Sequence, residues 1–207
     1  MLTSAEWFIA KRERGFSIIE LMVSVSLIAI LVMLAAPSLA TYTQNSKVRA
    51  AAESFLAGVQ SARVEALRTN LPVEMVLTTD APIAANKDTP NTSSTSGSWL
   101  VRRVATSGTT SFIDGKSALE GSGTGGASLV TVNAITASGA AQPTVTFTSS
   151  GNTNLGTSWQ VDFGSASANC ASASPPGPVR CLRVIVKPSG QVKSCDPAAT
   201  APDSRAC

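Results

Sequence analysis

An uninterrupted apolar segment near the N-terminus constrains this 207-residue chain more than any other feature. The segment extends from Phe16 to Ala36 and contains one charged residue, Glu20. As a helix it is roughly 30 Å long, which is the hydrocarbon thickness of a bilayer. The basic residues that precede it predict that the N-terminus stays in the cytoplasm. The sequence therefore predicts a transmembrane helix over residues 16–36, with everything after Pro37 across the membrane.

The carboxylate of Glu20 allows three readings of this segment. The segment can be a cleaved signal peptide, with Ser38–Ala40 as the small-residue cleavage site before Thr41. It can be a plain single-span anchor, in which a carboxylate at the centre costs about 2.5–3.5 kcal/mol. The third reading gives the acid a function and requires a partner for it, because an ionisable group inside a membrane is functional by default.

The third reading is favoured because "GFSIIELMVSVSLIAILVMLAAP" resembles the processing motif and first helix of type IV pilins and pseudopilins. The resemblance implies that a prepilin peptidase removes a leader, residues 1–15, by cutting after Gly15. It implies N-methylation of the new N-terminal residue, Phe16. It also implies that Glu20 pairs with the N-terminal amine of a neighbouring subunit during assembly. A buried amine needs an anionic partner, so the pair would also set the register between subunits.

A second, amphipathic helical pattern covers residues 37–71 and completes the stem. Pro37 has no amide hydrogen and is expected to kink or loosen the helix as it leaves the bilayer. Apolar residues then recur at spacings of three and four, which predicts one buried face. That face consists of Val48, Ala52, Phe55, Val59, Ala62 and Ala66.

From Leu71 onward the apolar period changes to two, so residues 72–207 are expected to form a β-rich globular head. The expected strands are 72–79, 98–105, 128–136, 144–148, 158–163, 181–187 and 191–195. With one long helix and mainly antiparallel strands, the fold class is α+β. The low-complexity connectors 86–98 and 121–128 are expected to be flexible surface loops.

Four cysteines, Cys170, Cys181, Cys195 and Cys207, lie near the C-terminus and include no C-x-x-C pair. In an exported head they predict two disulfides rather than a metal site. Three pairings are possible, and we favour Cys170 with Cys181 and Cys195 with Cys207. A loop of this length closed by a disulfide gains roughly 3 kcal/mol.

Catalysis is not expected. The chain has no histidine, which excludes histidine-based catalytic triads and histidine-ligated metal sites. The "DGKS" sequence at residues 114–117 lacks the first glycine of a phosphate-binding loop, and we interpret it as a surface turn. We therefore expect a non-enzyme without cofactor or metal.

Within the pilin superfamily, residues 52–77 and the later "VTFTSSGNTN" and "LRVIVKPSGQVKSC" segments resemble the GspH/FimT group. The resemblance implies two packed sheets on the helix and a minor pilin in the tip or priming complex of a type IV pilus. The first alternative is a minor pseudopilin of a type II secretion system. Either way, the partners are the prepilin peptidase, other pilins and the bacterial inner membrane, with the head in the periplasm.

A pilus-linked DNA receptor for natural transformation is the second alternative. Some members of the group bind DNA through two arginines after a glycine, but here those positions are Gln191 and Lys193. The candidate DNA contacts are Arg183, Lys187 and Lys193, and a solvated strand face is the favoured interpretation of these cations.

Overall fold

The computed structural model describes residues 15–105, 107–119 and 128–207. The leader expected at residues 1–15, apart from Gly15, and most of the flexible loop expected at 121–128 lie outside the described residues. Two compact units divide the chain, Met1–Ala40 and Thr41–Cys207, and each is described here by itself.

A single helix, α1 (Ile18–Thr69), contributes to both units and continues through position 37. It ends at Asn70, whose φ of 55° is in the left-handed region that terminates helices. The expected end of the stem near residue 71 is therefore close to the observed one. The kink expected at Pro37 stays a prediction.

The amphipathic pattern in the second part of α1 is confirmed by burial. All six residues of the predicted stripe are at most 1% exposed. Among them, the ring of Phe55 lies 5.5 Å from that of Trp159 and 5.4 Å from that of Phe163, between centroids. The stripe therefore forms the centre of the core of the head.

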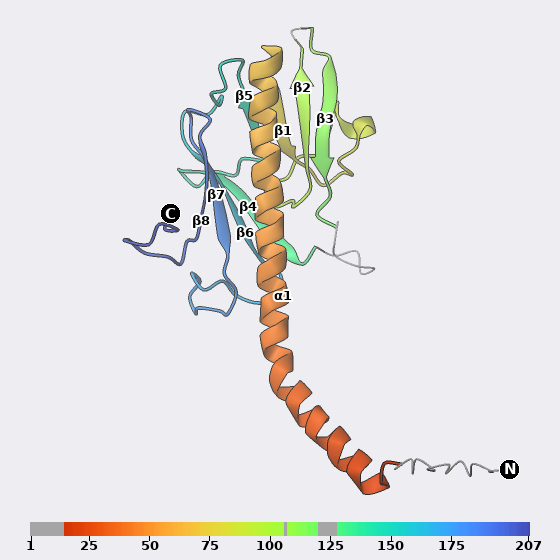
Figure 1. The fold of residues 1–207 in the computed structure, drawn as a ribbon. Coiled ribbons are helices and arrows are strands. Elements are labelled where there is room, and N and C mark those ends of the chain that lie inside the picture. Colours follow the sequence, from red (N-terminus) through yellow and green to blue (C-terminus); the bar gives the residue numbers. More distant parts are fainter. Residues whose placement is uncertain (1–14, 106, 120–127) are drawn as a thin grey trace, which may run out of the picture. The chain divides into compact units, whose positions relative to one another are not determined.

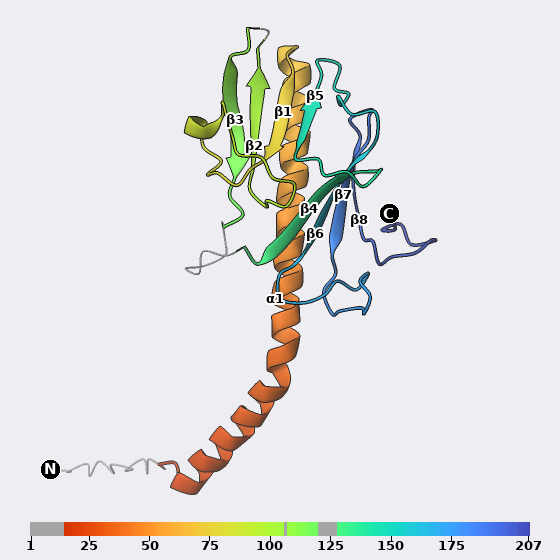
Figure 2. The same ribbon diagram turned by 180° about the vertical axis from the view of Figure 1, so that it is seen from behind.

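In the described part of the chain, eight strands follow the helix and form two small antiparallel sheets, as expected for an α+β fold. The first sheet has the order β3-β2-β1-β5 and the second β4-β6-β7-β8. Both sheets lie on the same side of the second part of α1, and they share one core with it (Figures 1 and 2). The strands are β1 (Val73–Leu77), β2 (Trp99–Val104), β3 (Thr110–Lys116), β4 (Val130–Thr136), β5 (Thr144–Phe147), β6 (Trp159–Ser165), β7 (Leu182–Val186) and β8 (Val192–Cys195).

One interpretation of the sequence is wrong. Residues 114–116 of the "DGKS" segment are not a turn but the end of β3, where Gly115 pairs with Leu100 and Lys116 with Trp99. Ladder pairing with β2 overrides the turn preference of Asp-Gly. Glycine is needed there because a Cβ atom at position 115 would meet the carbonyl oxygen of Pro82 at 2.6 Å.

The connector at residues 86–98 is more tightly tied to the sheet than its composition indicates. The Ser93 amide donates to the carbonyl of Leu77 at 3.1 Å, which extends the hydrogen bonding at the end of β1. The Asp80 carboxylate accepts from the backbone and the side chain of Asn91, and these hydrogen bonds lower the pKa of Asp80. A short 3₁₀ helix, η1 (Ala84–Asn86), precedes this connector.

Candidate functional site

The junction expected to be cleaved lies just before α1. Gly15, Phe16 and Ser17 have no regular structure, and the Phe16 side chain is 81% exposed. A Cβ atom added to Gly15 would meet no described atom within 4 Å. The described residues therefore give no steric reason for glycine at position 15.

Glu20 lies in the first turn of α1, where the helix dipole favours a carboxylate. It is exposed, and the sequence has no Lys or Arg between Arg14 and Lys47. Within residues 15–46, the positive group closest to Glu20 would be an α-amine created by cleavage before Phe16. Residues 15–46 therefore contain one carboxylic acid, Glu20, and no basic side chain.

The apolar surface around Glu20 is long enough and apolar enough to cross a membrane. The stretch Ile18–Ala35 is exposed throughout. Its serines do not leave unsatisfied hydroxyls, because Ser24 donates to the Glu20 carbonyl at 2.7 Å and Ser26 to that of Met22 at 2.8 Å. Hydroxyls bonded within the helix are compatible with a lipid environment.

Two disulfides hold the C-terminal part of the head. Cys170 is bonded to Cys181 and Cys195 to Cys207, the pairing favoured from the sequence. Cys181 and Cys195 are buried, so both crosslinks anchor their loops to the core.

The three cations considered for DNA binding lie on or just after the last two strands, but they do not form a free cluster. Arg183 makes a two-point ion pair with Asp162, at 2.6 and 2.9 Å, and this hydrogen bonding raises the pKa of Arg183. The Lys193 amine donates to the carbonyl of Ala206 at 2.8 Å. Because two of the three are already engaged within the head, the structure does not support the DNA-binding alternative.

Sequence reasoning missed a junction between the two glycine turns. Gly151 and Gly190 both have positive φ, and a Cβ atom at Gly190 would meet the carbonyl oxygen of Gly151 at 1.9 Å. From α1, the Arg63 Nε donates to that same oxygen at 3.2 Å. The sequence showed each turn separately, but no local signal indicates that the turns meet on the helix.

Two family models match the chain. Residues 10–36 match the prokaryotic N-terminal methylation motif, which places the chain in the class of pilin-like proteins. Residues 51–190, more than half of the chain, match the model described as type II transport protein GspH. The chain belongs to the GspH family. It is a structural subunit of the pilin and pseudopilin type and not an enzyme.

Solved structures similar to this chain include two minor subunits. One is the type IV minor pilin FimU of Pseudomonas aeruginosa PAO1, which is 17% identical to this chain with a TM-score of 0.48. The match covers 75% of this chain and 98% of that chain. The other is the minor pseudopilin EpsH from the type 2 secretion system of Vibrio cholerae, with 9% identity, coverage of 74% and 99%, and a TM-score of 0.46. No curated protein matches the sequence.

Proposed function

We propose that the chain is a minor pilin, a subunit of the tip or priming complex that supports assembly of a type IV pilus. The observation that carries the proposal is the exposed apolar stretch Ile18–Ala35 with its single carboxylate at Glu20. Family membership already implies assembly with other pilins or pseudopilins. The helix is the part suited both to the inner membrane and to a filament core.

Processing creates the functional end of this helix in the proposal. A prepilin peptidase cuts between Gly15 and Phe16 and methylates Phe16, and the exposed glycine without steric constraint supports this role. The resulting α-amine is poorly solvated beside lipid. A neighbouring subunit's Glu20 neutralises it, because an unpaired charge in hydrocarbon is costly.

The head lies in the periplasm in this proposal. Two disulfides close its C-terminal loops, and disulfides persist in oxidising compartments such as the periplasm. The C-terminal end of the head, with its disulfides, resembles that of type IV minor pilins more than that of minor pseudopilins, and this resemblance supports the pilus. One observation favours the second candidate, a minor pseudopilin of a type II secretion system: the matching family model is described as a type II transport protein.

A deletion strain complemented in two ways tests the proposal. The gene is deleted, and surface pili and secreted proteins are quantified in parallel. Loss of pili with normal secretion is expected, while the opposite pattern would establish the pseudopilin. The deletion strain is then complemented with the wild-type chain or with Glu20→Ala at equal protein level. The wild-type chain is expected to restore pili and Glu20→Ala is not, because the variant lacks the carboxylate. Full restoration by Glu20→Ala would refute the pairing of Glu20 with an amine.

A further inference from the structure

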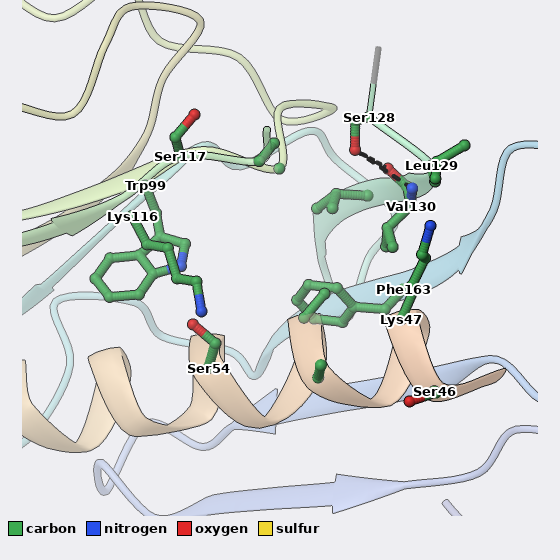
Figure 3. A pocket seen from close by; sticks show the side chains of 15 residues that line it. Ser46, Lys47, Ser54, Trp99, Lys116, Ser117, Ser128, Leu129, Val130 and Phe163 are labelled. Atoms are coloured by element: carbon green, nitrogen blue, oxygen red, sulfur yellow. Dashed lines mark hydrogen bonds between the residues drawn. The ribbon is translucent and has the colours of Figure 1, made fainter. Parts of the chain in front are cut away.

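An apolar pocket of about 230 Å³ opens on the head where α1 residues 46–54 meet both sheets. Figure 3 shows Trp99 and Lys116 at one end of it, and Phe163, Val130 and Lys47 at the other. The pocket therefore joins parts of the chain that are far apart in sequence. It lies entirely within the second unit.

Large apolar side chains form the floor of the pocket. Trp99, Val132 and Phe163 are at most 6% exposed and belong to the core. Leu129 also lines the pocket but is 39% exposed. A buried apolar floor and an exposed leucine favour insertion of one further apolar group, because such a group would cover Leu129 and remove water from the pocket.

The charged residues that line the pocket have one sign. Lys47 and Lys116 are among its lining residues, and Asp and Glu are not. Within the described ranges, neither lysine forms an ion pair with any carboxylate. Asp114, two residues before Lys116, lines a neighbouring groove instead and accepts the Gly115 amide at 2.8 Å. The pocket is therefore complementary to an apolar group that carries a negative charge nearby.

The undescribed segment that directly precedes Ser128 in sequence contains no such group. Residues 120–127 read "EGSGTGGA" and contain no apolar side chain larger than that of alanine. They include a carboxylate, Glu120, but no side chain that would fill an apolar pocket of this size. Residues 120–127 therefore do not supply the large apolar group that would fill the pocket.

We propose that this pocket is a docking site for a segment of a neighbouring pilin-like subunit. The segment inserts a large apolar side chain beside Trp99 and Phe163. It places a carboxylate, of the adjacent residue or the next one, near one of the two lysines, Lys47 or Lys116, which lie at opposite ends of the pocket. This inference rests on the proposed function, since it requires that the chain assembles with other pilin-like subunits.

Site-specific photocrosslinking in the full chain, in its native membrane, tests the docking. A photoreactive amino acid replaces Leu129, and the crosslinked residue of the partner is identified by mass spectrometry. The expected product joins position 129 to a residue of a pilin-like subunit. In that subunit, a large apolar residue and an Asp or Glu both lie within two positions of the crosslinked residue. A crosslink to residues 120–127 of the same chain, or to a partner segment without that pairing, overturns the proposal.

Two pairs of variants separate docking from general damage. Ala50→Leu narrows the pocket from an exposed helix position, and Ala57→Leu makes the same change two turns further along α1, outside the pocket. The first is expected to lower the crosslink yield at least fivefold and the second to leave it unchanged. The double variant Lys47→Gln/Lys116→Gln is expected to lower the crosslink yield similarly. The double variant Lys187→Gln/Lys193→Gln removes the same charge outside the pocket and is expected to leave the yield unchanged. Equal yields within either pair contradict the docking.

A second photoreactive position, Val23 in the exposed apolar helix, separates the two proposals. If Val23 crosslinks to a pilin-like subunit and Leu129 does not, the docking site is wrong and the proposed function stands. If Val23 gives no pilin-like partner, the proposed function fails, and the docking site fails with it.

Discussion

The first and second parts of α1 belong to one continuous helix but are built for different surroundings. Between Ile18 and Ala35 every described side chain is exposed, although nearly all are apolar. Between Thr41 and Thr69 one apolar face is buried in the head, while Tyr42, Val64 and Leu67 lie outside that face and are exposed. The second part finds its apolar partner within the chain, whereas the first part must find its partner in lipid or in another subunit.

Polar groups follow the same division. In the first part, Ser24, Ser26 and Ser38 donate to carbonyls of the helix itself. In the second part, several polar side chains of α1 contact the head or one another. Asn45 accepts the Arg180 amide at 2.8 Å, and Arg49 pairs with Glu53 at 2.7 Å. A helix that satisfies its hydroxyls internally is suited to hydrocarbon, and a helix that pairs its charges is suited to water and protein contacts.

The largest expected effect comes from truncating the core side of the helix. Phe55→Ala removes a buried ring that packs against Trp159 and Phe163, and it should lower the free energy of unfolding of the head by about 3–5 kcal/mol. Urea unfolding of the full chain in detergent, followed by near-UV circular dichroism, measures this. Leu27→Ala, in the exposed part, should leave the unfolding of the head unchanged. A similar loss in both variants would remove the distinction between the two parts.

Removal of the Cys170–Cys181 disulfide should have the next largest effect. The crosslink closes a loop with a sequence separation of 11, and disulfides of this loop length contribute about 3 kcal/mol. The double variant Cys170→Ser/Cys181→Ser should lower the melting temperature of the head. Membrane extraction, which depends on the first part of α1, should not change. If extraction changed as well, the two units would not be independent in the way described.

Gly58→Ala is expected to have a smaller effect, but its sign is informative. In an exposed helix the change from glycine to alanine stabilises by about 1 kcal/mol. At Gly58 the new Cβ atom would lie 2.6 Å from the ring of Trp99, and such overpacking costs about 1–3 kcal/mol. We therefore expect net destabilisation by thermal unfolding. A stabilised Gly58→Ala variant would show that the helix does not pack on β2 as closely as described.

The smallest effect concerns acid pH at the C-terminal loop. Hydrogen bonds from the Arg205 side chain, and then from its backbone, lower the pKa of Asp203 to about 2. A carboxylate with a lowered pKa stabilises the folded loop above its ordinary pKa of 3.8, and this contribution is lost as the pH falls toward 2. Carboxyl NMR titration should give a midpoint near 2, and Arg205→Gln should move it toward 3.8. A wild-type midpoint near 3.8 would contradict the ion pair.

The local patterns of the sequence predicted much of the fold, because helix and strand periodicity are visible over a few residues. The buried stripe of α1 and seven of the eight strands follow from such patterns. Strand β3 does not, since Phe112 and Ile113 are adjacent rather than alternating and the strand ends in Asp-Gly. It is an edge strand fixed by its backbone pairing with β2, and that pairing leaves no local signal.

Features that depend on contacts between distant residues were beyond sequence reasoning. Asp162 and Arg183 become ion-pair partners only because β6 and β7 are neighbours in a defined register. The pocket lined by Lys47, Trp99 and Phe163 likewise requires both sheets and the helix. By contrast, the candidate site at Gly15, Phe16 and Glu20 is contiguous in sequence, which is why a motif could reveal it.

The mass of the mature N-terminus tests the central claim most directly, namely that residues 16–35 are the working end of an assembled subunit. The full chain is extracted from its native membrane, and its N-terminal peptide is sequenced by mass spectrometry. The account predicts that the wild-type chain starts at N-methylated Phe16. In a variant with a larger residue at position 15, cleavage before Phe16 is expected to be lost. A chain that starts at Thr41, or one that keeps residues 1–15, would contradict it.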